Sequence, residues 1–202
     1  MSKKISSYFI FVGIIFFCLL FAIYASGIID SYKGKIKLCS SLNYHESLYL
    51  HPNNFGKFDL ALKILNESRW RKIAIEQEVK REEIVKKLKK GQHFEYSNRQ
   101  RTKASFILSI NNKLKCKVLA DIRIHGDRPD HRKGSGLPSL NVNLTDGHIF
   151  GVVDFILFRP ITRNYDNEIF ITTLLRELNF LAPRTSKVIV SYKNSNSEFI
   201  FQ

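Results

Sequence analysis

The stretch LADIRIHGDRPDHRKGSG, residues 119–136, decides the predicted fold of this chain. In its first part apolar residues alternate with Asp121, Arg123 and His125, a period of two that predicts a β-strand with these three side chains on one face. A loop rich in glycine, histidine, arginine and aspartate follows. Glycine lets backbone N–H groups approach an anion closely, and arginine clamps phosphate through two hydrogen bonds. The stretch therefore predicts an anion-binding loop at the end of a strand.

A second polar cluster opens the segment RPITRNYDNEIFITTLLRELNFLAPR, residues 159–184. Asn164 is a candidate N-cap, and the apolar residues after it recur at the spacing of one helix face, which predicts a helix over 163–179. Glu168 lies in its first turn. There it either orients a basic residue that holds phosphate or is an exposed acid favoured by the helix dipole. The two clusters together predict a site for an anionic ligand.

The rest of the chain predicts the remaining elements. Period-two runs indicate strands at 104–110, 114–125, 138–144, 149–158, 186–192 and 198–201. Residues 58–91 indicate a basic helical segment, with Gly91 as its C-cap and either a solvated face or a face that rests on lipid headgroups. The predicted fold class is α+β, in which a mostly antiparallel sheet with one packed helix follows the helical segment.

The N-terminal run 8–29 carries no charged residue. A bilayer core requires roughly 20 apolar residues in a helix, so this run predicts a transmembrane helix. The predicted organisation is a cytoplasmic tail and signal anchor over 1–29, a connector over 30–57, the helical segment over 58–91 and an α+β domain over 96–202. Two lysines in the short tail favour an inside N-terminus, which places the domain on the outer face of a single-pass membrane protein. The alternative is a signal peptide that is cleaved after Gly27.

The net charge narrows the class of partner, and the cysteines and histidines raise the questions of a disulfide and of a metal site. The net charge of +14 attracts phosphate, nucleic acid, lipid headgroups or acidic glycans. Nucleic acid is disfavoured, because aromatic residues do not interleave with the basic clusters. Cys39 and Cys116 are either two thiols, the interpretation we favour, or a disulfide formed in an oxidising compartment. A metal site at His125, Asp127 and His131 is disfavoured by the cationic neighbours.

The order of these pieces resembles the spore coat protein H (CotH) kinase-like family from about Leu119 to Gln202. The matching motifs are Ile122-Arg123-Ile124 with Gly126-Asp127, Pro138-Ser139-Leu140, Arg159-Pro160, Tyr165 with Asn167-Glu168, and Leu181-Ala182-Pro183-Arg184. The resemblance implies the N-terminal lobe of an atypical kinase fold that uses ATP with Mg or Mn. It also implies phosphate or nucleotide binding by Arg123, Gly126, Asp127, Arg128, Arg159 and Glu168.

Two departures limit what the resemblance implies. Asn141 and Asn143 stand where the family carries basic residues. The family's catalytic and metal-binding carboxylates follow the hairpin that ends here at Gln202, so no catalytic or metal residue is assigned and the domain is expected to be truncated. The predicted function is a membrane-anchored, outward-facing, CotH kinase-like protein that is not an active enzyme alone. Its expected partners are the membrane and either an anionic envelope component or a missing C-terminal half.

The alternative function is a non-catalytic cell-envelope module. Such a module would bind anionic glycan or lipid headgroups through Arg123, Arg128, Arg132 and Lys133, whose positive charges attract acidic polymers.

Overall fold

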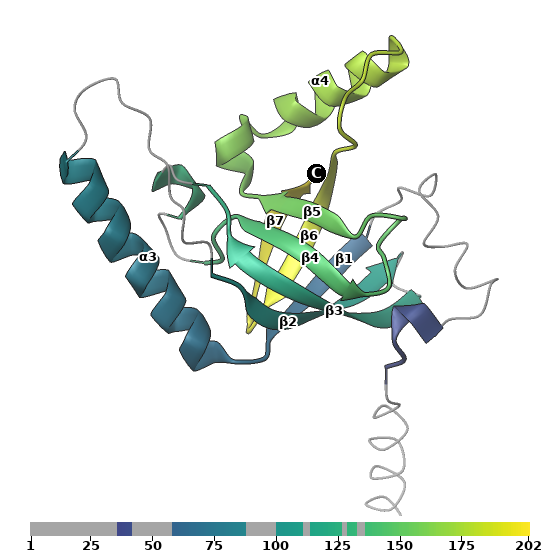
Figure 1. Ribbon diagram of the computed structural model, residues 1–202. Helices are drawn as coiled ribbons and strands as arrows, with labels where there is room; N and C mark the ends of the chain where they lie inside the picture. The colour runs from purple at the N-terminus through teal and green to yellow at the C-terminus, as the bar shows by residue number, and fades with distance from the viewer. Residues whose placement is uncertain (1–35, 42–57, 88–99, 111–113, 127–128, 133–135) are drawn as a thin grey trace, which may run out of the picture. The chain divides into compact units, whose positions relative to one another are not determined.

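The computed structural model describes residues 36–41, 58–87, 100–110, 114–126, 129–132 and 136–202, and within them seven strands form a closed barrel (Figure 1). The strands are β1 (Phe58–Ile64), β2 (Thr102–Ile110), β3 (Leu114–Ile124), β4 (Leu140–Asp146), β5 (Asp154–Phe158), β6 (Ser186–Tyr192) and β7 (Ser195–Phe201). Around the barrel their order is β1, β2, β3, β4, β5, β7, β6. Neighbouring strands are antiparallel except β1 and β6, a parallel pair that closes the barrel.

The barrel contradicts the predicted α+β fold with a kinase-like N-terminal lobe. Residues 58–64, which the sequence assigns to a helix, form β1 instead. Every second residue of β1 is buried, starting at Phe58, as expected for a strand that faces the barrel interior. Because β1 pairs with β2 on one side and β6 on the other, it joins the two ends of what would otherwise be an open sheet.

The strands predicted downstream are present with changed bounds. The most shortened is β5, because residues 149–152 form a tight turn in which Ile149 and Val152 bond to each other's backbone at 2.9 and 3.0 Å. Phe150 and Gly151 both have positive φ there, at 53° and 77°. The sequence pattern that predicted a single strand over 149–158 therefore covers both this turn and β5.

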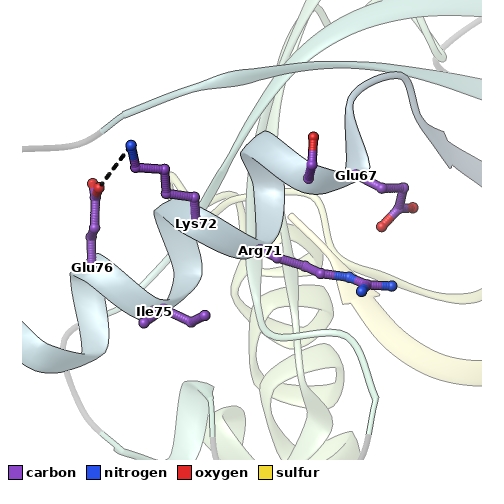
Figure 2. Close-up of a pocket in the computed structure, with 6 residues that line it drawn as sticks. Glu67, Arg71, Lys72, Ile75 and Glu76 are labelled. Atoms are coloured by element: carbon purple, nitrogen blue, oxygen red, sulfur yellow. Dashed lines mark ion pairs between the residues drawn. The ribbon is translucent and has the colours of Figure 1, made fainter.

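Helix α3 (Glu67–Lys87) follows β1 directly. The Asn66 carboxamide oxygen accepts a hydrogen bond from the Arg69 backbone N–H at 2.9 Å, which caps the first turn. Trp70 and Ile73 are buried on its inner side. A wide concavity of about 720 Å³ lies on its outer flank (Figure 2), where Lys72 and Glu76 form an exposed pair at 3.9 Å. All described residues that line this concavity belong to α3, so it is an open helix flank.

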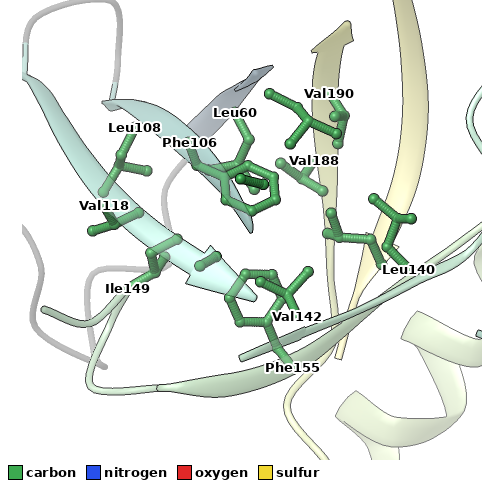
Figure 3. Close-up of a cluster of buried hydrophobic side chains, with 14 of the residues drawn as sticks. Leu60, Phe106, Leu108, Val118, Leu140, Val142, Ile149, Phe155, Val188 and Val190 are labelled. Atoms are coloured by element: carbon green, nitrogen blue, oxygen red, sulfur yellow. The ribbon is translucent and has the colours of Figure 1, made fainter. Parts of the chain in front are cut away.

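The core fills the barrel interior (Figure 3). Alternate residues of every strand point inward, among them Leu60, Phe106, Val118, Leu140, Val142, Phe155, Val188 and Val190. Phenylalanine rings also pack against one another in this core. The Phe58 ring stands edge-on to the Phe150 ring at 4.9 Å between centroids, and to the Phe201 ring at 5.4 Å. Because side chains occupy the interior, the barrel presents its functional groups on its outer face and at its ends.

A disulfide joins Cys39 to Cys116 across 77 residues of sequence. It ties the 3-10 helix η1 (Cys39–Ser41) to β3, and the Lys117 N–H adds a hydrogen bond to the Lys37 carbonyl at 2.8 Å. Both cysteines are buried. The favoured interpretation, two separate thiols, is therefore wrong, and the disulfide alternative holds.

The structure also contradicts the predicted single-pass membrane protein. In the described part of the chain, no helix has both the length and the apolar character needed to cross a membrane. The run 8–29, on which that prediction and the outward orientation depended, lies outside the described residues. So do residues 30–35 and 42–57 of the predicted connector 30–57, and residues 88–91 of the predicted helical segment.

The chain leaves the barrel after β5 for a 3-10 helix, η4 (Pro160–Arg163), and helix α4 (Asp166–Glu177), then returns as β6 (Figure 1). Asn164 is not the N-cap of α4. It has a left-handed conformation, with φ of 54°, and ends η4 by donating its backbone N–H to the Pro160 carbonyl. The helix begins after Tyr165, whose φ is 56°.

Candidate functional site

The two polar clusters meet around Ser139, a fully buried residue that directly precedes β4 in the sequence. The Ser139 hydroxyl accepts a hydrogen bond from the Arg159 backbone N–H at 3.0 Å. Its backbone carbonyl accepts from the His125 N–H at 2.7 Å, and its N–H donates to the His131 carbonyl at 2.9 Å. The loop after β3 and the start of η4 are therefore fixed to one another through this residue.

Arg159 adds a side-chain link between the clusters. Its Nη1 donates to the Asp130 carbonyl at 3.3 Å. Asp130 belongs to the short 3-10 helix η3 (Pro129–His131), so the guanidinium spans from the start of η4 to the loop after β3. The structure thus brings the Arg159 side chain to the loop after β3.

An aromatic cluster packs beside this junction. Phe158 is fully buried although its neighbour Leu157 occupies the barrel interior, so Phe158 points outward. The His125 ring stands edge-on to it at 5.1 Å between centroids, and the His131 ring lies at 6.1 Å. The Arg163 guanidinium covers the Phe158 ring at 3.8 Å from its centroid, a cation–π contact. Arg163 is therefore part of this aromatic cluster.

A pocket of about 270 Å³ opens beside the junction. Its polar lining residues are Arg159, Tyr165, Ser197 and Glu198, and the remaining lining residues are Gly136, Leu137, Pro160, Ile161 and Phe199. These residues come from the loop before β4, from the segment 159–165 that contains η4, and from β7. The pocket is therefore assembled from three segments that are distant in the sequence.

The Glu198 carboxylate has a counter-ion. Lys187 Nζ lies 3.7 Å from Glu198 and 2.7 Å from the Asp166 carboxylate. The hydrogen bond to Asp166, helped by the attraction of Glu198, raises the pKa of Lys187. Since Lys187 stays charged, it offsets part of the negative charge that Glu198 brings to the pocket.

The other predicted site residues lie elsewhere. Arg123 is on the outer face of β3, opposite Asn141 of β4. Glu168 is on α4, where its Oε1 accepts a hydrogen bond from the Gln202 side chain at 2.9 Å. Asp127 and Arg128 lie outside the described residues.

Arg132, a residue of the alternative glycan-binding prediction, is occupied by the fold. Its Nη2 donates to the Gly126 carbonyl at 2.9 Å, and its Nη1 lies 3.7 Å from the Glu78 carboxylate of α3. Only 12% of its side chain is exposed. Arg132 therefore fastens the loop to α3, and Lys133 lies outside the described residues.

Sequence reasoning missed Tyr165, Ser197 and Glu198 as pocket residues. Tyr165 belongs to a quoted motif, but Ser197 and Glu198 lie in a plain hairpin strand with no motif to mark them. In the described part of the chain no group of three His, Cys, Asp or Glu side chains is placed to hold a metal ion.

Nothing matched this chain in comparisons with models of protein families, with curated proteins or with solved structures. The resemblance to the CotH kinase-like family accordingly stays a prediction.

Proposed function

We propose that this protein is a non-catalytic module that binds an acidic glycan, with one acidic sugar unit held in the Arg159 pocket. The observation that carries the proposal is that Arg159, the exposed Tyr165, Ser197 and Glu198 line one pocket. The high positive charge of the chain supports it further, since it attracts an acidic polymer to the surface.

Each pocket group suits one part of an acidic sugar. A guanidinium pairs with a carboxylate, sulfate or phosphate in a bidentate, charge-assisted geometry. The Ser197 hydroxyl and the Glu198 carboxylate accept hydrogen bonds from ring hydroxyls. The Tyr165 ring, more than half exposed at 57%, offers an apolar face with a polar tip at the pocket rim. The pocket of about 270 Å³ is at the small end of ligand sites, which suits a single sugar unit.

The backbone around Arg159 is already ordered by the Ser139 hydrogen bond. A ligand that binds there does not have to order the loop, so less of the binding energy is lost to conformational entropy. Glu198 would weaken the binding of an anion by itself, and its pairing with Lys187 limits that effect.

The test is a titration of the full chain with polygalacturonate at physiological ionic strength, with neutral dextran as the negative ligand. We expect Arg159→Ala to weaken polygalacturonate binding at least about tenfold, the loss typical of a charged hydrogen bond. The matched control is Arg176→Ala, which removes the same charge from an exposed position on α4. Equal losses in the two variants would mean unspecific attraction and would overturn the proposal.

A second experiment distinguishes glycan binding from nucleotide binding. ATP with Mg²⁺ is added to the protein alone and as a competitor of polygalacturonate. Saturable binding of ATP that Arg159→Ala abolishes, together with displacement of the glycan, would replace this proposal by the nucleotide-binding function that the family resemblance implies.

A further inference from the structure

Helix α4 carries large apolar side chains on the side away from its buried face. Phe170, Ile171, Leu174 and Leu178 recur at the spacing of one helix face, and their exposed fractions lie between 42% for Leu174 and 64% for Phe170. The opposite face holds Thr172, which is buried and hydrogen-bonded to the Glu168 carbonyl and to Thr185.

The exposed apolar surface continues beyond the helix. Phe180 is 63% exposed and Leu181 is completely exposed in the segment that returns to β6. We call Phe170, Ile171, Leu174, Leu178, Phe180 and Leu181 the α4 stripe. Usually the apolar face of an amphipathic helix packs on its own domain, whereas here the more apolar face points outward.

The size of the stripe indicates an interface. A large side chain that is fully exposed presents on the order of 200 Å², so the α4 stripe presents roughly 700 Å². Single chains rarely expose contiguous apolar patches beyond a few hundred Å², and a stable interface buries about 800 Å² per partner. We propose that the α4 stripe is the contact surface of a two-fold symmetric dimer of this chain.

The stripe is suited to a second copy of itself. If two α4 helices pack antiparallel about Leu174, Phe170 of one protomer lies opposite Leu178 of the other, and Leu174 meets its own equivalent. The two helix dipoles then lie antiparallel, with opposite ends near each other, and each contact occurs twice, as in an isologous interface.

The dimer does not depend on the proposed glycan function. The residues that line the Arg159 pocket are not part of the α4 stripe. A failure of either proposal therefore leaves the other standing.

The first test is sedimentation equilibrium of the full chain over a range of concentrations, with the expected result of a monomer–dimer equilibrium. Leu174→Glu places two like charges against each other at the two-fold axis, so we expect the dissociation constant to rise at least about tenfold. Val153→Glu is the matched control, because it makes a similar change at an apolar side chain that is 51% exposed outside the stripe. A monomer at all concentrations, or an equal rise for both variants, would overturn the proposal.

The second test reads the geometry directly. In a Cys18→Ser background, Leu174→Cys is expected to form a disulfide-linked dimer under mild oxidation, because its two copies face each other at the axis. Thr173→Cys, which is also exposed but turned about 100° around the helix, is expected to cross-link far more slowly. Equal cross-linking of the two variants would rule out this packing.

Discussion

The His131 ring stands directly against Gly126 in the loop after β3. A Cβ atom on Gly126 would lie 2.2 Å from His131 Cγ, and the backbone there has a φ of +80°. The Gly126 carbonyl at the same time accepts the hydrogen bond from Arg132. Close approach and a left-handed backbone therefore both require glycine at this position.

We expect Gly126→Ala to lower the free energy of unfolding by about 2–4 kcal/mol, from backbone strain and the clash with His131 together. Gly147→Ala is the matched control, since its φ of +73° is similar but its nearest neighbour is 3.4 Å away. Urea denaturation at constant m-value measures both. Equal losses would mean that His131 moves aside without cost.

The Cys39–Cys116 disulfide gives a second prediction. Because it closes a long loop in the unfolded chain, its reduction should lower the free energy of unfolding by about 2–4 kcal/mol. Thermal unfolding with and without a reductant measures the effect. The Cys39→Ser variant should unfold at one temperature under both conditions, and a reductant-insensitive wild type would show that the disulfide contributes nothing.

The sequence predicts β3 well, because polar and apolar residues alternate from Ala120 to His125, with Asp121 and Arg123 on the polar face. It fails at β1, where Leu60 and Ile64 fit the spacing of a helix as well as that of a strand. The segment then runs almost directly into α3, so its pattern merges with a true helix. What decides its conformation is the pairing of Leu60 with Val190, a contact between residues far apart in the chain that no local pattern reveals.

In the candidate site, too, some residues are recognisable from the local sequence, whereas the contacts of others depend on the tertiary fold. Gly126 and Arg159 are recognisable from their local motifs, and the structure places both at the junction around Ser139. The use of Arg132 could not be foreseen, because its partner Glu78 lies on α3. Likewise the Gln202 partner of Glu168 becomes its neighbour only when β7 closes against β5.

Tyr192 gives the third prediction, since it links β6 to the start of α3. Its hydroxyl lies 2.9 Å from both carboxylate oxygens of Glu67. Tyr192→Phe should lower the free energy of unfolding by about 1–2 kcal/mol, the range for a hydrogen bond to a charged group that is partly exposed. Tyr165→Phe, at an exposed ring, is the control and should change it little. An effect of equal size in the two variants would show that the Glu67 contact is not stabilising.

The fourth prediction concerns acid. Glu78 accepts a hydrogen bond from Arg81 Nε at 3.2 Å, and its other oxygen lies 3.7 Å from Arg132. The Arg81 hydrogen bond lowers the pKa of Glu78 below its ordinary value of 4.5; burial opposes this, and the attraction of Arg81 and Arg132 adds to it. Since the folded protein favours the ionised form, Glu78 stabilises the fold above the ordinary pKa, and this contribution is lost as the pH falls through the lower, folded value.

Between about pH 6 and about pH 3 the wild type should therefore lose more stability than Glu78→Gln, which cannot ionise there. Glu76→Gln is the control, because Glu76 has only the distant, exposed Lys72 as its ion-pair partner among the described residues. Urea midpoints measured across the range give the comparison. If wild type and Glu78→Gln lose stability in parallel, the folded protein does not favour the ionised form of Glu78, and its contacts with Arg81 and Arg132 do not stabilise the fold.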